Sequence, residues 1–241
     1  MAGGQSRRMG QNKAALLIGG KSLVDRAAET LGSISGKVYV VGNQAGETTS
    51  LPIIQDHPTK SNSRGSIVGL YTALVNATTD WVAVLACDLP FITSELMTRM
   101  VDILRHDVTP QVIAVDAIFA EQPDGRIQPL CGLYRRISSL PAIKNMLSDG
   151  DWRLQRLREQ LKTRVLGLAE IADIPGSESL FFNLNTPEEY RLAVEIEQRQ
   201  EFDRPFCTRD TKDAYGRPSK VIGHPLDPHP DRFDLPFNKE L

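Results

Sequence analysis

MAGGQSRRMGQNK (residues 1–13) opens the 241-residue chain and combines three glycines with three basic residues. A glycine backbone takes positive φ easily and, because it has no Cβ, brings its N–H group close to a ligand. Successive N–H groups in such a loop form a concave anion site, to which arginine and lysine add full positive charge. On composition alone two interpretations stay open, an ordinary turn or a phosphate-binding loop built on Gly3, Gly4, Arg8 and Lys13.

The spacing of this loop is more specific than its composition. It fits neither a Walker A loop nor a dinucleotide fingerprint, because the Gly-Lys-Ser/Thr and G-x-G-x-x-G patterns are absent. Written as A-G-G-x-S-x-R-M-G-x-x-K over residues 2–13, it resembles the signature loop of the MobA-like nucleotidyltransferases, which wraps the phosphates of a nucleoside triphosphate. The resemblance implies that Ala2, Gly3 and Gly4 bind the nucleotide. Met1 stands at the leucine of the family pattern, so we expect the strand that feeds the loop to be missing from the chain as given.

The overall composition favours a globular protein of the cytoplasm. Hydrophobic residues make up 41% of the chain, enough for one sizeable core, and the net charge of −2 argues against bulk binding of nucleic acid. No apolar run approaches the roughly 20 residues of a membrane span, and no secretion signal opens the chain. The cysteines, Cys87, Cys131 and Cys207, are too far apart for a CxxC motif, and their odd number fits a reducing compartment. We expect no nucleic-acid or membrane partner.

Short strands alternate with helices along most of the chain. Strands are predicted at 37–41, 53–54, 81–86 and 111–115. Helices are predicted at 22–31, 67–75, 94–104 and 140–164, the last with a break at 149–151. This alternation predicts an α/β fold with a mostly parallel sheet and helices on both faces. The resemblance to the MobA-like nucleotidyltransferases implies that this sheet is Rossmann-like and of the nucleotide-diphospho-sugar transferase type. Ligands of such sheets bind beyond the carboxyl ends of the strands. The phosphate loop, Asn43, Asp56 and Asp88 all follow strands and are expected to converge there.

The chain changes character near residue 198. Arginine, aspartate and proline become frequent and few apolar positions recur with a helical period, and the stretch 224–230 is too rich in proline for a helix interior or a central strand. We therefore expect a transferase domain over residues 1–197 and a Pro- and charge-rich tail over 198–241.

Asp88 is the strongest single candidate for chemistry. It ends an apolar strand, and an oxygen ligand in such a place suits Mg²⁺, which is usually shared with substrate phosphates. The alternative is that Asp88 caps the next helix, although Ser94 looks better placed for that. Cys87-Asp88-Leu-Pro90-Phe91 resembles the C-D-x-P-[FY] motif of the family, whose aspartate binds magnesium. The resemblance thus makes Asp88 the metal ligand and, with Arg8 and Lys13, a catalytic residue.

Two further segments resemble nucleotide-binding parts of the family. Residues 65–70 (GSIVGL) are similar to G-P-L-x-G-L, with Ser66 in place of the proline and with Gly69 kept. Asp56 falls where the family carries a nucleotide-binding aspartate, and its alternative is a surface turn residue before His57-Pro58. The resemblance implies that Asp56, Gly69 and Asp88 contact the nucleotide together with the loop.

The acceptor side is indicated by residues 183–189 (NLNTPEE). Thr186, Pro187 and Glu189 are explained by a capping box at a helix start. The capping box does not account for Asn183 and Asn185, whose amides can donate hydrogen bonds to a polar ligand and accept them from it. The segment resembles the N-x-N-T-P-E-[DE] motif, which lies at the acceptor side of the cleft in the family. Residues 128–134 resemble the strand that borders its pterin site, with Cys131 there as a packing residue.

Together the matches run through residues 1–196 and resemble a molybdenum cofactor guanylyltransferase. Such an enzyme transfers GMP from GTP to molybdopterin and releases pyrophosphate, with Mg²⁺ as its cofactor. The resemblance also implies molybdoenzymes or other cofactor-biosynthesis proteins as partners. One alternative is a CTP-dependent cytidylyltransferase of the same superfamily, and another is a degenerate nucleotide-binding protein without catalysis.

Overall fold

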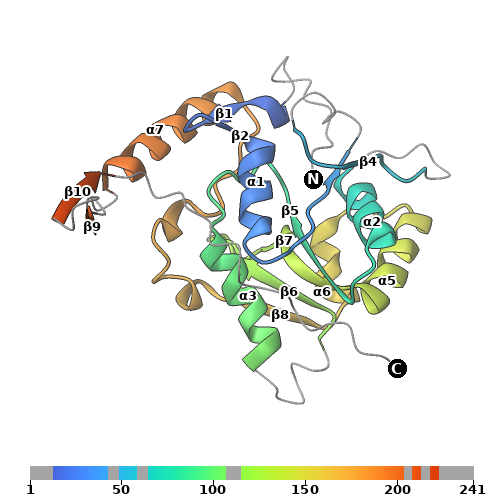
Figure 1. The fold of residues 1–241 in the computed structure, drawn as a ribbon. Helices are drawn as coiled ribbons and strands as arrows, with labels where there is room; N and C mark the ends of the chain where they lie inside the picture. Colours follow the sequence, from blue (N-terminus) through green and yellow to red (C-terminus); the bar gives the residue numbers. More distant parts are fainter. Residues whose placement is uncertain are drawn as a thin grey trace.

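The fold is built on a four-stranded sheet in the order β5-β7-β6-β8, seen in a computed structural model (Figure 1). The structure describes residues 13–42, 49–58, 65–106, 115–203, 208–212 and 218–222. The strands are β5 (Trp81–Leu85), β6 (Ala117–Glu121), β7 (Ile127–Arg135) and β8 (Thr163–Leu166). β6 and β8 are parallel, while β7 runs antiparallel to both of its neighbours. The expected α/β class is confirmed, with β7 as the strand that departs from the parallel direction.

Two short strands, β3 (Val40–Val41) and β4 (Ile53–Ile54), pair in parallel and form a separate sheet. Among the described residues, β3 pairs only with β4 and β5 only with β7. Ala2, Gly3, Gly4, Arg8 and Asn43 lie outside the described residues.

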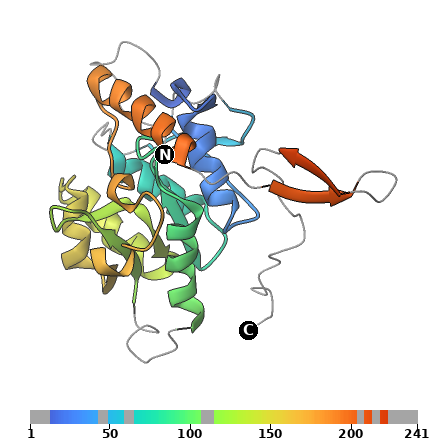
Figure 2. The same ribbon diagram turned by 90° about the vertical axis from the view of Figure 1, so that its left-hand side faces the viewer.

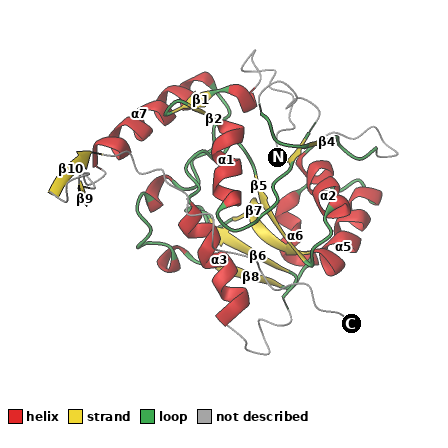
Figure 3. Cartoon of the chain, viewed as in Figure 1, coloured by secondary structure: helices red, strands yellow, loops and turns green. Residues whose placement is uncertain are grey.

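Helices cover both faces of the four-stranded sheet (Figure 3). The period of two along the strands sends Val84 and Phe119 to one face and Leu85 and Ile118 to the other. The first face packs against α2 (Ser66–Asn76), α5 (Arg136–Ser148) and α6 (Leu157–Gln160). The second face packs against α1 (Leu23–Gly32) and α3 (Ser94–His106). None of the helices that the structure describes combines the length and apolar character that a membrane crossing needs.

A third apolar cluster joins the start of the described chain to its last long helix, α7 (Pro187–Asp203). Ala14 and Ile18 meet Leu184 and Ala193 there, so residues far apart in the sequence share one core. The short elements nearby are η1 (Lys13–Ala15), β1 (Leu17–Ile18) and β2 (Lys21–Ser22), and those before α7 are η2 (Leu154–Arg156), η3 (Leu168–Glu170) and η4 (Ser177–Ser179).

Helix starts follow the expected capping chemistry with one change. Ser22 caps α1, since its side chain accepts a hydrogen bond from the backbone N of Asp25. At α3 the expected cap Ser94 is the first helical residue, and Thr93 is the cap instead, because its hydroxyl accepts from the backbone N of Leu96. A threonine one residue earlier satisfies the same free N–H groups.

The structure bears on three other predicted boundaries, of which the end of the helix predicted at 140–164 is wrong. Thr163 and Arg164, expected to be helical, begin β8 because they pair with β6. Most of the predicted strand 111–115 lies outside the described residues, and the strand seen next is β6, from Ala117. α7 continues to Asp203, so the expected boundary at 197/198 falls inside a helix, and β9 (Thr208–Lys212) and β10 (Pro218–Ile222) follow as an antiparallel hairpin (Figure 2).

Gly132 on β7 provides a test of this packing. A Cβ at this position would lie 2.7 Å from both the carbonyl oxygen of Ile118 and Cδ1 of Phe119. Because both atoms belong to the buried sheet, we expect Gly132→Ala to lower the free energy of unfolding by about 1–3 kcal/mol. Urea unfolding followed by circular dichroism measures the change. The control Gly32→Ala meets nothing within 4 Å at the end of α1, and it should leave stability unchanged or slightly raised. Equal losses in both variants would contradict this packing argument.

Candidate active site

Lys13, Asp88 and Asn185 meet at one point although they lie far apart in the sequence. Lys13 Nζ donates to Asn185 Oδ1 at 2.9 Å and to Asp88 Oδ2 at 3.3 Å. The side chains of Lys13 and Asp88 are 17% and 29% exposed, so the ion pair is partly buried yet open to a ligand. Three of the residues predicted from separate motifs are therefore brought into direct contact. We call them the Lys13–Asp88–Asn185 cluster.

Asp88 is placed by the carboxyl end of β5. Pairing with β7 continues one residue past the strand, since the backbone N of Ala86 donates to Leu130 O at 2.8 Å. A turn follows, closed by a hydrogen bond from Leu89 N to Ala86 O. Leu89 is buried in the core while Asp88 between these anchors is only partly covered. The strand and the turn thus present the carboxylate at the edge of the sheet.

Asn185 is placed by the cap of α7. Glu189 Oε2 accepts from the backbone N of Asn185 at 2.6 Å and of Thr186 at 2.8 Å, while Thr186 Oγ1 accepts from Glu189 N at 3.2 Å. The predicted capping box is therefore confirmed. The backbone N of Leu184 also donates to Asp88 O at 2.9 Å, which ties this segment directly to the turn after β5. Asn183 is exposed on the same segment.

Lys13 is the first described residue and opens η1. Behind it, the side chain of Ala14 is buried in the apolar cluster that also contains Cys87 and Leu184, the neighbours of the two partners of Lys13. Burial of these flanking residues holds the three segments together and leaves their polar side chains on the outside. The rest of the predicted phosphate loop, including Arg8, precedes the described residues.

Asp56 and Gly69 belong to a neighbouring part of the fold. Asp56 follows β4, and burial raises the pKa of its carboxyl above the ordinary value. The next residue, His57, donates its backbone N to Thr72 Oγ1 at 2.8 Å, and its ring stacks edge-on against Tyr71. Gly69 is buried in the same helix, α2. The structure thus joins the end of β4 to α2, while the predicted contact of Asp56 and Gly69 with a nucleotide stays a prediction.

β7 contains residues 128–134, which resemble the strand bordering the pterin site of the family. Most of its side chains are buried. Cys131 is fully buried, its Sγ lies 3.9 Å from Met97 Sδ, and burial raises the pKa of its thiol to about 12. Tyr134 is also fully buried and donates its hydroxyl to Pro129 O at 2.6 Å. A thiol with this pKa and no solvent access does not serve as a nucleophile at neutral pH. Cys131 is therefore a packing residue, as expected.

The donor atoms of the cluster are compatible with a shared magnesium site. In the described part of the chain, no group of three or more His, Cys, Asp or Glu side chains gathers to hold a metal by itself. Asp88 instead offers one partly exposed carboxylate beside the amide oxygen of Asn185. Mg²⁺ is commonly held by one or two carboxylates together with substrate phosphates and water. The site fits that arrangement better than a cage made only of protein ligands.

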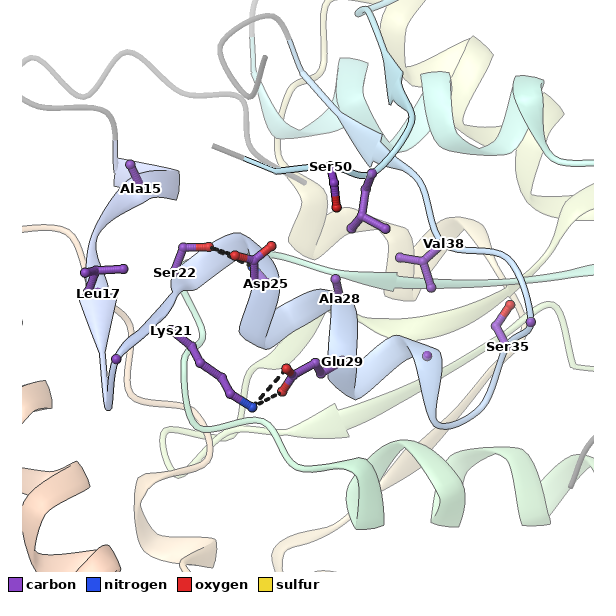
Figure 4. A pocket seen from close by; sticks show the side chains of 14 residues that line it. Ala15, Leu17, Lys21, Ser22, Asp25, Ala28, Glu29, Ser35, Val38 and Ser50 are labelled. Atoms are coloured by element: carbon purple, nitrogen blue, oxygen red, sulfur yellow. Dashed lines mark hydrogen bonds and ion pairs between the residues drawn. The ribbon is translucent and has the colours of Figure 1, made fainter. Parts of the chain in front are cut away.

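A groove of about 970 Å³ opens along α1 (Figure 4), and no residue of the Lys13–Asp88–Asn185 cluster lines it. Its lining includes Ala28 and Val38, the ion pair of Lys21 with Glu29, and Asp25 hydrogen-bonded to the hydroxyl of Ser22. None of the residues predicted for the site lines this groove.

Two charged residues that contact the segments of the cluster carry no signal in the sequence. Arg26 on α1 and Glu197 on α7 form a largely buried ion pair with a distance of 2.8 Å between Nη2 and Oε2. Each is a charged residue on a helix, which from sequence alone looks like part of a solvated face. Only their burial, with Glu197 5% exposed, distinguishes them.

Comparison with known proteins identifies the class that this fold and site define. The profile of the MobA-like NTP transferase domain matches residues 1–165. The chain belongs to the MobA-like NTP transferase family and is a nucleotidyltransferase.

Its relatives carry a more particular name. The chain is 29% identical over 198 residues to a probable molybdenum cofactor guanylyltransferase of Carboxydothermus hydrogenoformans, covering 81% of this chain and 93% of that protein. It is 30% identical over 191 residues to the molybdenum cofactor guanylyltransferase of Aliivibrio fischeri strain MJ11, covering 78% and 90%.

A solved structure supports the fold. Molybdopterin-guanine dinucleotide biosynthesis protein A of Archaeoglobus fulgidus superposes with a TM-score of 0.66 at 20% identity, covering 82% of this chain and 96% of that one.

The buried thiol of Cys131 predicts how stability changes in alkali. Between its ordinary pKa of 9.0 and its folded value of about 12, the unfolded chain has lost the proton that the native chain keeps. The free energy of unfolding should therefore fall as the pH rises through this window, by up to about 1.4 kcal/mol per pH unit, and stay unaffected below it. Guanidinium unfolding at pH 8, 9.5 and 10.5 measures the slope. Cys131→Ala should flatten it, although Cys87 and Tyr134, whose pKa values burial also raises, leave a remainder. An identical slope in both proteins would contradict the assignment.

Proposed function

We propose that this nucleotidyltransferase transfers GMP from GTP to molybdopterin and releases pyrophosphate. The observation that carries the proposal is the Lys13–Asp88–Asn185 cluster, in which Lys13 donates hydrogen bonds to both Asp88 and Asn185. The motifs of these three residues resemble the phosphate loop, the magnesium site and the acceptor side of the family. The names of the relatives, molybdenum cofactor guanylyltransferases over about four fifths of the chain, support the choice of substrates.

The reaction asks the protein for position and charge more than for covalent chemistry. A terminal phosphate oxygen of molybdopterin attacks the α-phosphorus of GTP and forms a new P–O bond. The bond from the α-phosphorus to the bridging oxygen breaks, and its electron pair leaves with pyrophosphate. Holding both reactants in line and neutralising the leaving charge accounts for most of the rate enhancement in such transfers. No side-chain nucleophile is needed, in keeping with buried Cys131.

Each member of the cluster has a role in this proposal. Lys13 neutralises the leaving phosphates together with Arg8, while the backbone N–H groups of Gly3 and Gly4 bind phosphate oxygens. Asn185, with Asn183 beside it, orients the acceptor through amide hydrogen bonds. Asp56 and Gly69 contact the rest of the nucleotide. In the ligand-free protein the ion pair with Asp88 keeps the ammonium of Lys13 in place for the incoming phosphates.

Asp88 would hold Mg²⁺. When bound, the ion supplies positive charge that substrate oxygens share as the negative charge of pyrophosphate develops. The contribution of the chain is the fixed position of the carboxylate at the end of β5 and its distance of 3.3 Å from Lys13 Nζ.

Removing the charge of Asp88 tests the catalytic assignment. We expect Asp88→Asn to lower pyrophosphate release by about 10²-fold or more, because a ligand for the metal and a partner of Lys13 are lost. The fold should persist, since the pair is partly exposed and contributes at most about 1 kcal/mol. A coupled phosphate assay with GTP, Mg²⁺ and molybdopterin measures the rate. Asp102→Asn, an exposed carboxylate on α3, is the matched control and should retain full activity. Full activity of Asp88→Asn would refute the role of this residue.

The choice of base can be tested by ligand-dependent stability. GTP should raise the melting temperature more than CTP or ATP at equal concentration, because a ligand stabilises the native state according to the logarithm of its concentration over Kd. Differential scanning fluorimetry with Mg²⁺ present gives the three shifts. A larger shift with CTP would favour the cytidylyltransferase alternative. Binding without pyrophosphate release from any triphosphate would favour a nucleotide-binding protein without catalysis.

A further inference from the structure

The side chain of Arg26 binds three separate segments of the chain. From α1, its Nη1 donates to Ile18 O at 3.2 Å and its Nε donates to Pro90 O at 3.2 Å. Nη1 and Nη2 also donate to the two carboxylate oxygens of Glu197, at 2.9 and 2.8 Å. The side chains of Arg26 and Glu197 are only 19% and 7% exposed. The guanidinium is therefore a largely buried junction between parts of the chain that are distant in sequence.

Each of these segments carries one residue of the Lys13–Asp88–Asn185 cluster. Ile18 ends the short stretch that begins with Lys13 at η1. Pro90 lies in the turn that presents Asp88. Glu197 lies on α7, whose capping box fixes Asn185. The four hydrogen bonds of Arg26 thus connect the three segments that carry Lys13, Asp88 and Asn185. None of these bonds goes to the cluster residues themselves.

The chemistry of the junction requires arginine. A planar guanidinium presents donors in several fixed directions at once, whereas a lysine ammonium is a compact charge on a flexible stem. The close approach also depends on Gly19, whose φ is +57° and whose Cβ, if present, would lie 2.7 Å from Glu197 Oε1. A buried ion pair contributes little net stability compared with apolar residues of similar volume. Stability alone therefore does not account for the placement of this pair.

We propose that Arg26 is a positioning residue for the nucleotidyl transfer, fixing the relative placement of the segments that carry Lys13, Asp88 and Asn185. It acts through Ile18, Pro90 and Glu197 and does not touch substrate. The kinetic part of this inference rests on the proposed function, whereas the structural part does not depend on any activity.

A double substitution separates positioning from stability. Arg26→Met alone leaves the Glu197 carboxylate buried without its partner and should lower the melting temperature strongly. Arg26→Met combined with Glu197→Met replaces the pair by apolar side chains and should recover most of that loss. The carbonyl groups of Ile18 and Pro90 still lack their donor in the double variant. We therefore expect its kcat to remain about tenfold or more below that of the unaltered protein, with a smaller change in KM for the triphosphate.

Hydrogen exchange gives a readout that needs no activity. In the double variant, amides of residues 13–22, 86–93 and 183–190 should exchange faster, while those of β7 stay protected. Arg99→Met is the matched control, because Arg99 also binds a carboxylate, Asp173, and a backbone carbonyl, Glu170 O. Its exchange at the three segments and its kcat should match the unaltered protein.

The outcomes test the positioning role of Arg26 and the proposed function separately. A double variant that recovers stability, kcat and exchange protection together would overturn the positioning role. Unaltered protein that releases no pyrophosphate from any triphosphate would refute the proposed function instead, and the exchange data would then decide the role of Arg26. Faster exchange at the three segments would support it, and unchanged exchange would overturn it.

Discussion

The contact of Lys13 with Asp88 and Asn185 is the constraint on which the site depends, because it joins residues 75 and 172 positions apart. Hydrogen bonds between partly exposed side chains are too weak to hold such distant segments together by themselves. The apolar cluster beneath does so, with Ala14, Cys87 and Leu184 buried next to the three polar residues. In each of the three segments, a polar residue of the site is therefore followed or preceded by a buried apolar residue that anchors it.

The arrangement also explains why the segments come from these particular places in the fold. β5 is buried between layers of helices, so its carboxyl end is a fixed point, and the turn after it carries Asp88. The start of α7 carries Asn185 and is bonded to that turn through Leu184 N and Asp88 O. Sites at the carboxyl ends of strands are common in α/β sheets because loops there can vary while the sheet stays rigid. The nucleotidyltransferase class follows from the family to which the chain belongs.

Local sequence signals predicted the elements better than their limits. The apolar run at 81–86 and the capping box at Thr186–Glu189 were both recognisable, because strand burial and helix capping depend on neighbouring residues. The sequence predicts a helix at Thr163 and Arg164 because nothing local shows that β6 lies alongside to pair with them. It does not predict the continuation of α7 to Asp203, because the last turns of this helix lack a clear apolar period.

The sequence by itself determined the class of fold and the residue types of the site, because motif spacing and strand–helix alternation are written along the chain. Lys13, Asp88 and Asn185 were each predictable from their own motif. Only the tertiary structure decided that Lys13 bonds to both of the others, and that Arg26 and Glu197 form a buried pair behind them. A charged residue on a helix looks the same in sequence whether it faces water or another helix. Burial is a property of what packs against it, and that is settled only when distant segments meet.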